Sequence, residues 1–139
     1  MPRTRVETRA RARVLQALYA WDLRGEQQLE RVATQIWDDL SVPPDERKLA
    51  SQFVRTLTKH GTELDAEITE VTANWRLERL GVIDRCVLRL AAAELQHGET
   101  PPRVVIQEAV RLAERYGSVK SAKFVNGVLD ALARRMGRM

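Results

Sequence analysis

The hydrophobic residues of the chain recur every three to four positions, the spacing that places them along one face of an α-helix. The alternation of apolar and polar positions that is typical of strands is nearly absent. Glycine and proline divide the pattern into segments joined by short loops. The spacing therefore predicts an all-α fold of six or seven helices. They cover about residues 5–23, 28–40, 44–75, 82–97, the stretch from ETPPR to Tyr116, and 118–136, with a short helix or turn at NWRLERLG.

The third of these patterns contains an interruption. Its apolar stripe runs from Leu49 to Trp75, and His60 and Gly61 lie in its middle. A glycine in a helix interior costs about 1 kcal/mol relative to alanine. A kink or a helix end at this point is therefore an open alternative to one long helix.

The segment 82–97 is apolar over more than half of its circumference, which is typical of a helix at the centre of a core. Glu94 falls between Val87 and Leu90 on the buried side. A buried carboxylate must be paired or neutral, so we expect a structural ion pair or a helix-end hydrogen bond rather than catalysis. The strip of this helix that water could reach contains only Arg85, Arg89, Ala92 and Gln96.

The size and composition of the chain limit its class. A chain of 139 residues, 44% of them hydrophobic, can form one domain or two small subdomains with a shared core. The single cysteine, Cys86, excludes an internal disulfide and indicates a reducing compartment. No apolar run approaches the roughly 20 residues that span a bilayer, and no apolar signal segment follows the first arginines. These features predict a cytoplasmic protein.

Few residues offer chemistry for catalysis or metal binding. His60 and His97, together with Cys86, are too few for a zinc site, and each histidine is expected near a helix end. The chain contains neither GxGxxG nor GxxxxGK[ST]. Ser118 and Ser121 have no base nearby in the sequence, and Ser118 is well placed to cap the last helix. We therefore predict no enzymatic activity, no cofactor and no metal.

Positive charge gathers near the two ends of the chain, although the net charge is only +4. Basic segments of this kind suit nucleic acid or an anionic surface, but two solvated tails would have the same composition. The arginines concerned are Arg3, Arg5, Arg9, Arg11, Arg13, Arg134, Arg135 and Arg138.

The first predicted helix combines charge with an aromatic ring. At 100° per residue, Arg11 lies in line with Leu18, whereas Arg9 and Arg13 lie on the polar side. Tyr19 lies at the rim of the apolar stripe. Single-stranded RNA is bound by cations along its backbone and aromatic rings under its bases. A tyrosine at the edge of the core, with its hydroxyl in water, is the simpler alternative.

The last predicted helix contains the sequence KFVNGVLDAL, residues 123–132. Lys123 and Gly127 lie beyond Phe124 around the helix, and Asn126 lies further round. Gly127 would let a ligand approach the backbone closely, while the other three offer a charge, a ring and an amide. Alternatively, Gly127 admits a neighbouring helix and Phe124 packs beneath it.

Four segments together carry a family resemblance: RARARVLQALYAWDL, LGVIDRCVLRLAAAEL, TPPRVVIQEAVRLAERYGS and KFVNGVLDAL. In this order, and nearly end to end, the chain resembles the NusB family of bacterial transcription antitermination factors. The resemblance implies a compact fold of about seven helices in two small bundles packed across each other. It places the N-terminal subdomain at 1–75, the C-terminal subdomain at 76–139, and a basic, flexible arm at 1–8.

The resemblance also implies a function without catalysis. The protein would bind the boxA element of nascent ribosomal RNA transcripts jointly with NusE, a small-subunit ribosomal protein. It would act in the RNA polymerase antitermination complex and in ribosomal RNA maturation. RNA contacts are implied for seven residues, the first two at phosphates: Arg9, Arg11, Tyr19, Asp84, Lys123, Phe124 and Asn126.

The chain departs from the family pattern at two places. Glu7 and Thr8 stand where relatives often have more arginines, and Val119 and Lys120 stand where acids are common. With the first departure, the phosphate affinity expected of the arm is either lower or shared with Arg3 and Arg5. The second departure adds positive charge beside the expected RNA surface and leaves any role of the acids without a counterpart here.

Two other functions remain open from the sequence. One is a helical protein-interaction module whose basic ends are incidental, which would bind RNA only through the generic, salt-dependent charge effect. The other is a stand-alone relative of the N-terminal RNA-binding domain of RNA cytosine methyltransferases, since the chain is too short to hold the methyltransferase domain itself. A second copy of the chain could also cover the expected RNA surface in a homodimer.

Overall fold

The computed structural model describes residues 5–25, 27–72, 77 and 80–139. Within this part of the chain all regular structure is helical, which confirms the all-α class. The predicted helix bounds are correct to within one residue at all but two places: the end of the third helix, and the start of the fifth, which was expected in ETPPR from Glu99 and lies at Pro102. The six helices are α1 (Arg5–Arg24), α2 (Leu29–Asp39), α3 (Pro44–Val71), α4 (Val82–His97), α5 (Pro102–Tyr116) and α6 (Val119–Arg135).

Some predictions fall wholly or partly outside the described residues. Outside them lie Trp75, most of NWRLERLG and the expected subdomain boundary between residues 75 and 76. The seventh helix and the division into two subdomains therefore stay predictions. Of the expected arm, residues 5–8 are helical and form the start of α1. The flexible arm over residues 1–8 stays a prediction.

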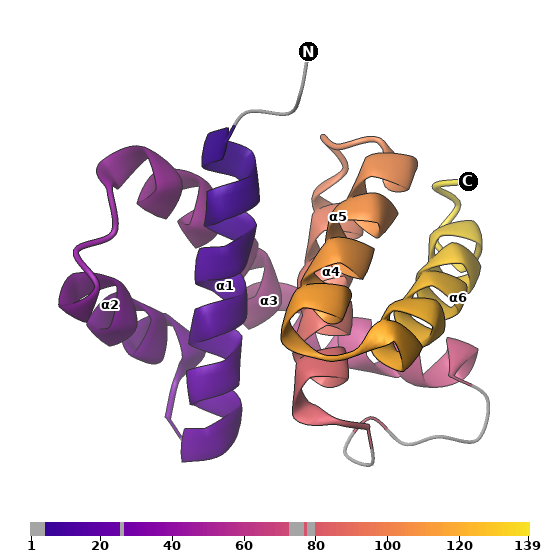
Figure 1. Ribbon diagram of the computed structural model, residues 1–139, viewed down its shortest axis with the longest axis horizontal. Helices are drawn as coiled ribbons and strands as arrows, with labels where there is room; N and C mark the ends of the chain where they lie inside the picture. Colours follow the sequence, from indigo (N-terminus) through magenta and orange to yellow (C-terminus); the bar gives the residue numbers. More distant parts are fainter. Residues whose placement is uncertain (1–4, 26, 73–76, 78–79) are drawn as a thin grey trace.

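One continuous core joins all six helices. Figure 1 shows α1 and α2 on one side and α5 and α6 on the other, with α3 crossing behind them. At 1.5 Å per residue α3 is about 42 Å long, which lets it contact α1, α2, α4 and α6. α4 contacts α1, α3, α5 and α6, and buried side chains of all six helices form a single cluster. None of the described helices is long and apolar enough to cross a membrane.

α4 is the most deeply buried helix, as its apolar circumference predicted. Its residues from Cys86 to Leu95 are buried except for Arg89. The expected wettable strip is wrong for three of its four members. Ala92 is fully buried, and the side chains of Arg85 and Arg89 are only 12% and 13% exposed because they pair with acids of neighbouring helices. Only Gln96 is exposed.

α3 continues through His60 and Gly61 as one helix of 28 residues. Leu57 on one side of the pair and Leu64 and Ile68 on the other are all buried. We infer that packing on both sides outweighs the roughly 1 kcal/mol that a helical glycine costs. The alternative of a helix end at this point is therefore wrong, whereas a kink stays a prediction.

Helix ends are fixed by local hydrogen bonds. The hydroxyl of Ser118 accepts a hydrogen bond from the backbone N–H of Ser121 at 3.1 Å, which confirms the predicted cap of α6. Gly98 ends α4 in the left-handed conformation, with φ 83°. Arg138 then donates to the carbonyl oxygens of Leu95 at 2.5 Å and Thr100 at 3.0 Å, so the segment after α6 holds the end of α4.

Candidate nucleic-acid interface

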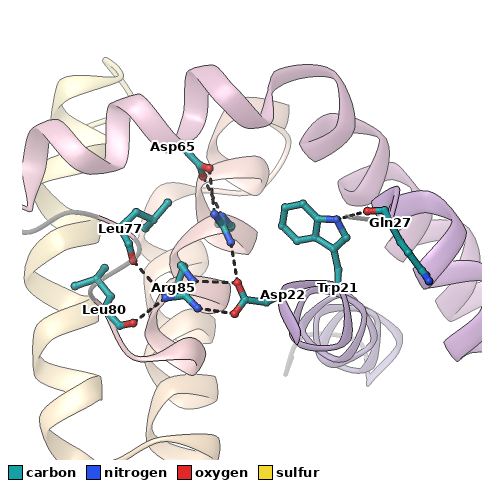
Figure 2. A network of polar contacts seen from close by, with 8 residues as sticks. Trp21, Asp22, Gln27, Asp65, Leu77, Leu80 and Arg85 are labelled. Atoms are coloured by element: carbon teal, nitrogen blue, oxygen red, sulfur yellow. Dashed lines mark hydrogen bonds and ion pairs between the residues drawn. The ribbon is translucent and has the colours of Figure 1, made fainter. Parts of the chain in front are cut away.

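One end of α1 is fastened to α4 by Asp22 and Arg85. Figure 2 shows the two side chains facing each other, and Arg85 donates to Asp22 Oδ1 at 3.1 Å through Nε and to Oδ2 at 2.5 Å through Nη2. Its third nitrogen donates to the carbonyl oxygen of Leu80 at 2.8 Å. The hydrogen bond with Asp22 is the main reason why the pKa of Arg85 is raised, so the guanidinium stays charged.

Arg89 extends this network to α3. Its Nε and Nη2 donate to the two carboxylate oxygens of Asp65 at 3.0 and 3.2 Å. Its guanidinium also lies 5.3 Å from the ring centre of Trp21, within the range of a cation–π contact. The indole N–H of Trp21 points the other way in Figure 2 and donates to the carbonyl oxygen of Gln27 at 2.7 Å. The C-terminal half of α1 is thereby held against both α3 and α4.

The opposite end of α1 is fastened to α4 and α5 by Arg11. Arg11 Nε and Nη2 donate to the two oxygens of Glu94 at 2.9 and 2.5 Å, and Nη1 donates to Glu108 Oε1 at 2.8 Å. The hydroxyl of Thr8 donates to the same oxygen of Glu108 at 2.9 Å. Burial acts to lower the pKa of Arg11, but the hydrogen bond and charge of Glu94, with the charge of Glu108, outweigh it and the pKa is raised.

This geometry confirms one expectation and corrects another. Glu94 is 2% exposed and forms the structural ion pair that its helical phase indicated. Arg11 was expected at an RNA phosphate, but it is 3% exposed and each of its three guanidinium nitrogens donates to a carboxylate. The structure therefore assigns Arg11 to the core, and it is not part of the surface that we consider for RNA.

Arg9 remains on the surface. Its side chain is 57% exposed, and its Nη1 lies 3.7 Å from Oε2 of the buried Glu46. Arg13 donates to the other oxygen of Glu46 at 3.2 Å. Because Arg13 makes the shorter contact, Arg9 can turn toward a phosphate without leaving Glu46 unpaired.

Tyr19 lies in an apolar groove of about 530 Å³ between α1, α2 and α4. Its side chain is 42% exposed, so one part of the ring faces solvent. Tyr116, at the end of α5, lines the same groove and is 44% exposed. The Arg115 guanidinium lies 5.3 Å from the centre of the Tyr116 ring. We call this the tyrosine groove; its lining also includes Leu15, Ile36, Leu40 and Ile83.

Asp84 follows directly after Ile83, a lining residue of the tyrosine groove. It is half-buried, and its Oδ1 is buried without a hydrogen-bond partner in the described part of the chain. Its position in the first turn of α4 also suits a negative charge, because the helix dipole is positive there. A structural role is therefore sufficient to explain Asp84, and its contact with RNA stays a prediction.

Lys123 and Asn126 are exposed and line a second groove, of about 800 Å³, between α5 and α6. Val119, just after the turn at Gly117 and Ser118, lines it as well. Tyr116, just before that turn, lines the tyrosine groove. Of the expected site residues, Tyr19 thus lines the tyrosine groove and Lys123 and Asn126 line the second groove. The other four line neither groove: Arg9, Arg11, Asp84 and Phe124.

Phe124 and Gly127 differ in their surroundings. Phe124 is half-buried and packs against the hydrophobic core, so at least part of its ring serves the fold. Gly127 is exposed, and a Cβ built on it would meet no atom within 4 Å. The alternative that Gly127 admits a neighbouring helix is therefore wrong. The close approach of a ligand to this glycine stays a prediction.

The C-terminal arginines bind carboxylates or backbone carbonyls of the protein itself. Arg134 pairs with Asp130 at 3.1 Å and Arg135 with Glu67 at 2.6 Å, while Arg138 binds backbone carbonyls. The second basic end of the sequence therefore contributes less positive surface than its composition indicates.

Tyr116 was missed by sequence reasoning, which used it only as the end of a helix. The available signal was an aromatic residue between Arg115 and Gly117, on a helix whose apolar stripe was already complete with Ala109 and Ala113. Its proximity to Tyr19, however, depends on how α5 packs beside α4 and could not be derived from α5 alone.

Comparison with known proteins gives a consistent result. A profile of the NusB family matches residues 8–134. The transcription antitermination protein NusB of Anaeromyxobacter dehalogenans is 45% identical over 129 residues, which cover 91% of this chain and 89% of that protein. The protein of the same name from Solibacter usitatus is 41% identical over 130 residues, with coverage of 92% and 88%.

Two solved structures are similar over nearly the whole chain. T. maritima NusB superposes with a TM-score of 0.85 at 36% identity, covering 96% of this chain and 93% of that one. A chain from a structure of the antitermination factors NusB and NusE in complex with double-stranded RNA superposes with a TM-score of 0.84 at 32% identity, covering 96% and 99%.

Proposed function

Because this chain belongs to the NusB family, we propose that it is an RNA-binding transcription antitermination factor. Its RNA ligand would be the boxA element of nascent ribosomal RNA transcripts, bound together with NusE. The complex would support processive antitermination and ribosomal RNA maturation. A structurally similar chain comes from a complex that contains NusE and double-stranded RNA, which supports NusE and RNA as partners but not the choice of a single strand.

The observation that supports RNA binding most directly is the tyrosine groove. Tyr19 and Tyr116 are both more than 40% exposed and line the same groove, so both rings are open to a ligand. Aromatic faces in a groove stack with unpaired bases, each stack contributing about 1–3 kcal/mol. Lys123, on the other side of the turn from α5 to α6, and Arg9 supply positive charge for the backbone. This combination favours single-stranded RNA over a duplex, whose bases are already stacked.

The same features support a role without catalysis. Ser118 caps α6, which accounts for its position without a nucleophilic role. Burial raises the pKa of Cys86 to about 12, so its thiol is unreactive near neutral pH. We therefore propose that the protein is not an enzyme and that it works in the cytoplasm, where transcripts are made.

The proposal is tested by titrating a fluorescently labelled boxA-type RNA with the protein, with and without purified NusE, at several salt concentrations. We expect tighter binding with NusE and weaker binding of a duplex of the same sequence. Lys123→Gln should reduce the salt slope by about 0.7, the value for one phosphate contact on a single strand. Arg31→Gln, which removes an exposed charge on α2, is the matched control.

Three results would favour other functions. Binding of NusE without any RNA affinity beyond the generic, salt-dependent charge effect would indicate a protein-interaction module. Equal binding of all RNA sequences would support a general RNA-binding domain like that of the methyltransferases. Self-association that competes with RNA, measured by light scattering, would show that a second copy covers this surface.

A further inference from the structure

α3 and the end of α4 form an open pocket of about 400 Å³ far from the tyrosine groove. Its lining residues are Gln52, Arg55, Thr56, Lys59, His60 and His97. We propose that this basic pocket binds a phosphate group. Ile83 in the tyrosine groove and His97 in the basic pocket are separated by 14 helical residues, or about 21 Å along α4, so this is a second site. It does not depend on the proposed function.

Two cations in the pocket have no acidic partner. Arg55 and Lys59 lie one helical turn apart on α3, both exposed, and no carboxylate of the described residues pairs with either. Arg11, Arg85 and Arg89, in contrast, are each held by carboxylates. The positive charge of Arg55 and Lys59 is therefore available to a ligand.

His97 reaches the pocket from the last turn of α4. Its ring stands edge-on to the ring of Phe53, with centroids 5.7 Å apart and planes at 81°. Phe53 is 3% exposed and therefore a rigid support. The imidazole of His97 is thus oriented by the core, which makes the pocket more than a group of mobile surface side chains.

The two histidines also have unused hydrogen-bonding capacity. His60 Nδ1 and His97 Nε2 are buried, and neither has a hydrogen-bond partner in the described part of the chain. A carboxylate lies near each of them, Glu63 at 3.6 Å from His60 Nδ1 and Glu99 at 3.4 Å from His97 Nε2, and the two glutamate side chains are 79% and 78% exposed. These two carboxylates can swing into solvent, so a bound oxyanion can replace them.

The combination of groups favours a phosphate over other ligands. Arg55 and Lys59 repel a metal ion, and no group of three or more His, Cys, Asp or Glu residues in the described part could hold one. A guanidinium matches two phosphate oxygens at once, and an ammonium adds a point charge. The amide of Gln52 is a neutral donor on the same wall. The phosphate could belong to an RNA backbone or to a small molecule.

The test is an NMR titration of the full-length protein with inorganic phosphate at constant pH and ionic strength, with chloride as the reference salt. We expect saturable shifts of the His60 and His97 imidazole signals. Arg55→Gln combined with Lys59→Gln should weaken binding about tenfold, since one exposed ion pair corresponds to about two- to fivefold. Glu99→Gln should strengthen it, and Arg31→Gln should leave it unchanged.

The source of the phosphate is identified by adding boxA-type RNA to the phosphate-loaded protein. Displacement of phosphate by RNA assigns the pocket to the RNA backbone, and binding of phosphate without competition assigns it to a small molecule. Shifts that do not saturate, or that persist unchanged in the folded double variant, would overturn the proposal. If Tyr19→Leu binds RNA as tightly as the wild type, that result counts against the proposed function. Phosphate binding in the basic pocket would not be affected by it.

Discussion

Arg11 and Glu94 face each other across the interface between α1 and α4, and two hydrogen bonds join them although 83 residues separate them in sequence. Both side chains are at most 4% exposed. Water therefore cannot replace either partner, and the loss of one leaves the other charged and buried.

Replacement of Arg11 by alanine should lower the free energy of unfolding by about 3–5 kcal/mol, the usual effect of breaking a buried ion pair from one side. Glu108 would lose its contact as well. Urea denaturation followed by circular dichroism measures the change. Arg9→Ala is the control on the same helix, and because Arg9 is 57% exposed we expect a change below about 0.5 kcal/mol. Equal unfolding midpoints for the two variants would mean that Arg11 has no structural role.

Glu94→Gln keeps the size of the side chain and removes its charge. It should destabilise the protein by about 1–3 kcal/mol, because Arg11 loses a charged hydrogen-bond partner inside the core. The RNA affinity of the folded variant should equal that of the wild type, since Glu94 is 2% exposed. A change in affinity at constant stability would place Glu94 in the binding surface instead.

Tyr116→Leu removes an aromatic face but keeps an apolar side chain at the rim of the tyrosine groove. Because Tyr116 is 44% exposed, stability should change little. RNA affinity should fall by about 1–3 kcal/mol if a base stacks there. Fluorescence anisotropy gives the affinity, and a thermal melt of the same sample provides the control for folding. Unchanged affinity would limit the stacking surface to Tyr19.

Gly127→Ala should stabilise the protein by up to about 1 kcal/mol, because alanine favours a helix and its Cβ would meet no atom within 4 Å. If RNA approaches the backbone at this glycine, affinity should fall despite the gain in stability. Opposite signs in the two measurements would support a ligand contact. A variant that is more stable and binds normally would show that the glycine is not needed for either.

Cys86 should make the stability of the protein depend on pH in the alkaline range. Burial raises its pKa from 9.0 to about 12, so between these values the unfolded chain loses a proton that the folded chain keeps. Stability should therefore be unaffected below about pH 9 and should fall above it, by roughly 1.4 kcal/mol per pH unit from this group. Thermal melts at pH 8.5 and 10.5 should show a smaller loss for Cys86→Ala. The same loss in both proteins would mean that the thiol is accessible to water.

The helices of this protein could be predicted because they depend on local information. The spacing of apolar residues, Gly98 after α4 and Ser118 before α6 all act within a few residues of the feature that they fix. The exception was Gly61, where the local cost favours an interruption. The packing of Leu57 and Leu64, which comes from the tertiary structure, keeps α3 continuous.

The candidate site was harder to predict because it depends on which helices meet. The helical phase correctly placed Glu94 inward and aligned Arg11 with Leu18, so each half of the pair was visible in the sequence. Nothing local indicates that these two residues contact each other, and an arginine in a basic segment resembles a phosphate ligand. The packing of α1 against α4 brings Arg11 to Glu94 and so removes Arg11 from the surface. It also explains why Arg85 is paired with Asp22, while the contact between α3 and α4 pairs Arg89 with Asp65.

The contacts of Arg138 have a consequence for synthesis of the chain on the ribosome. The carbonyl oxygen of Gly98 lies 3.5 Å from a nitrogen of Arg138, 40 residues later in the sequence. Because the same side chain binds Leu95 and Thr100, the end of α4 obtains its last hydrogen-bond donors only after α5 and α6 have been made. During translation, the C-terminal turn of this central helix therefore lacks the donors of Arg138 until residue 138 has been made.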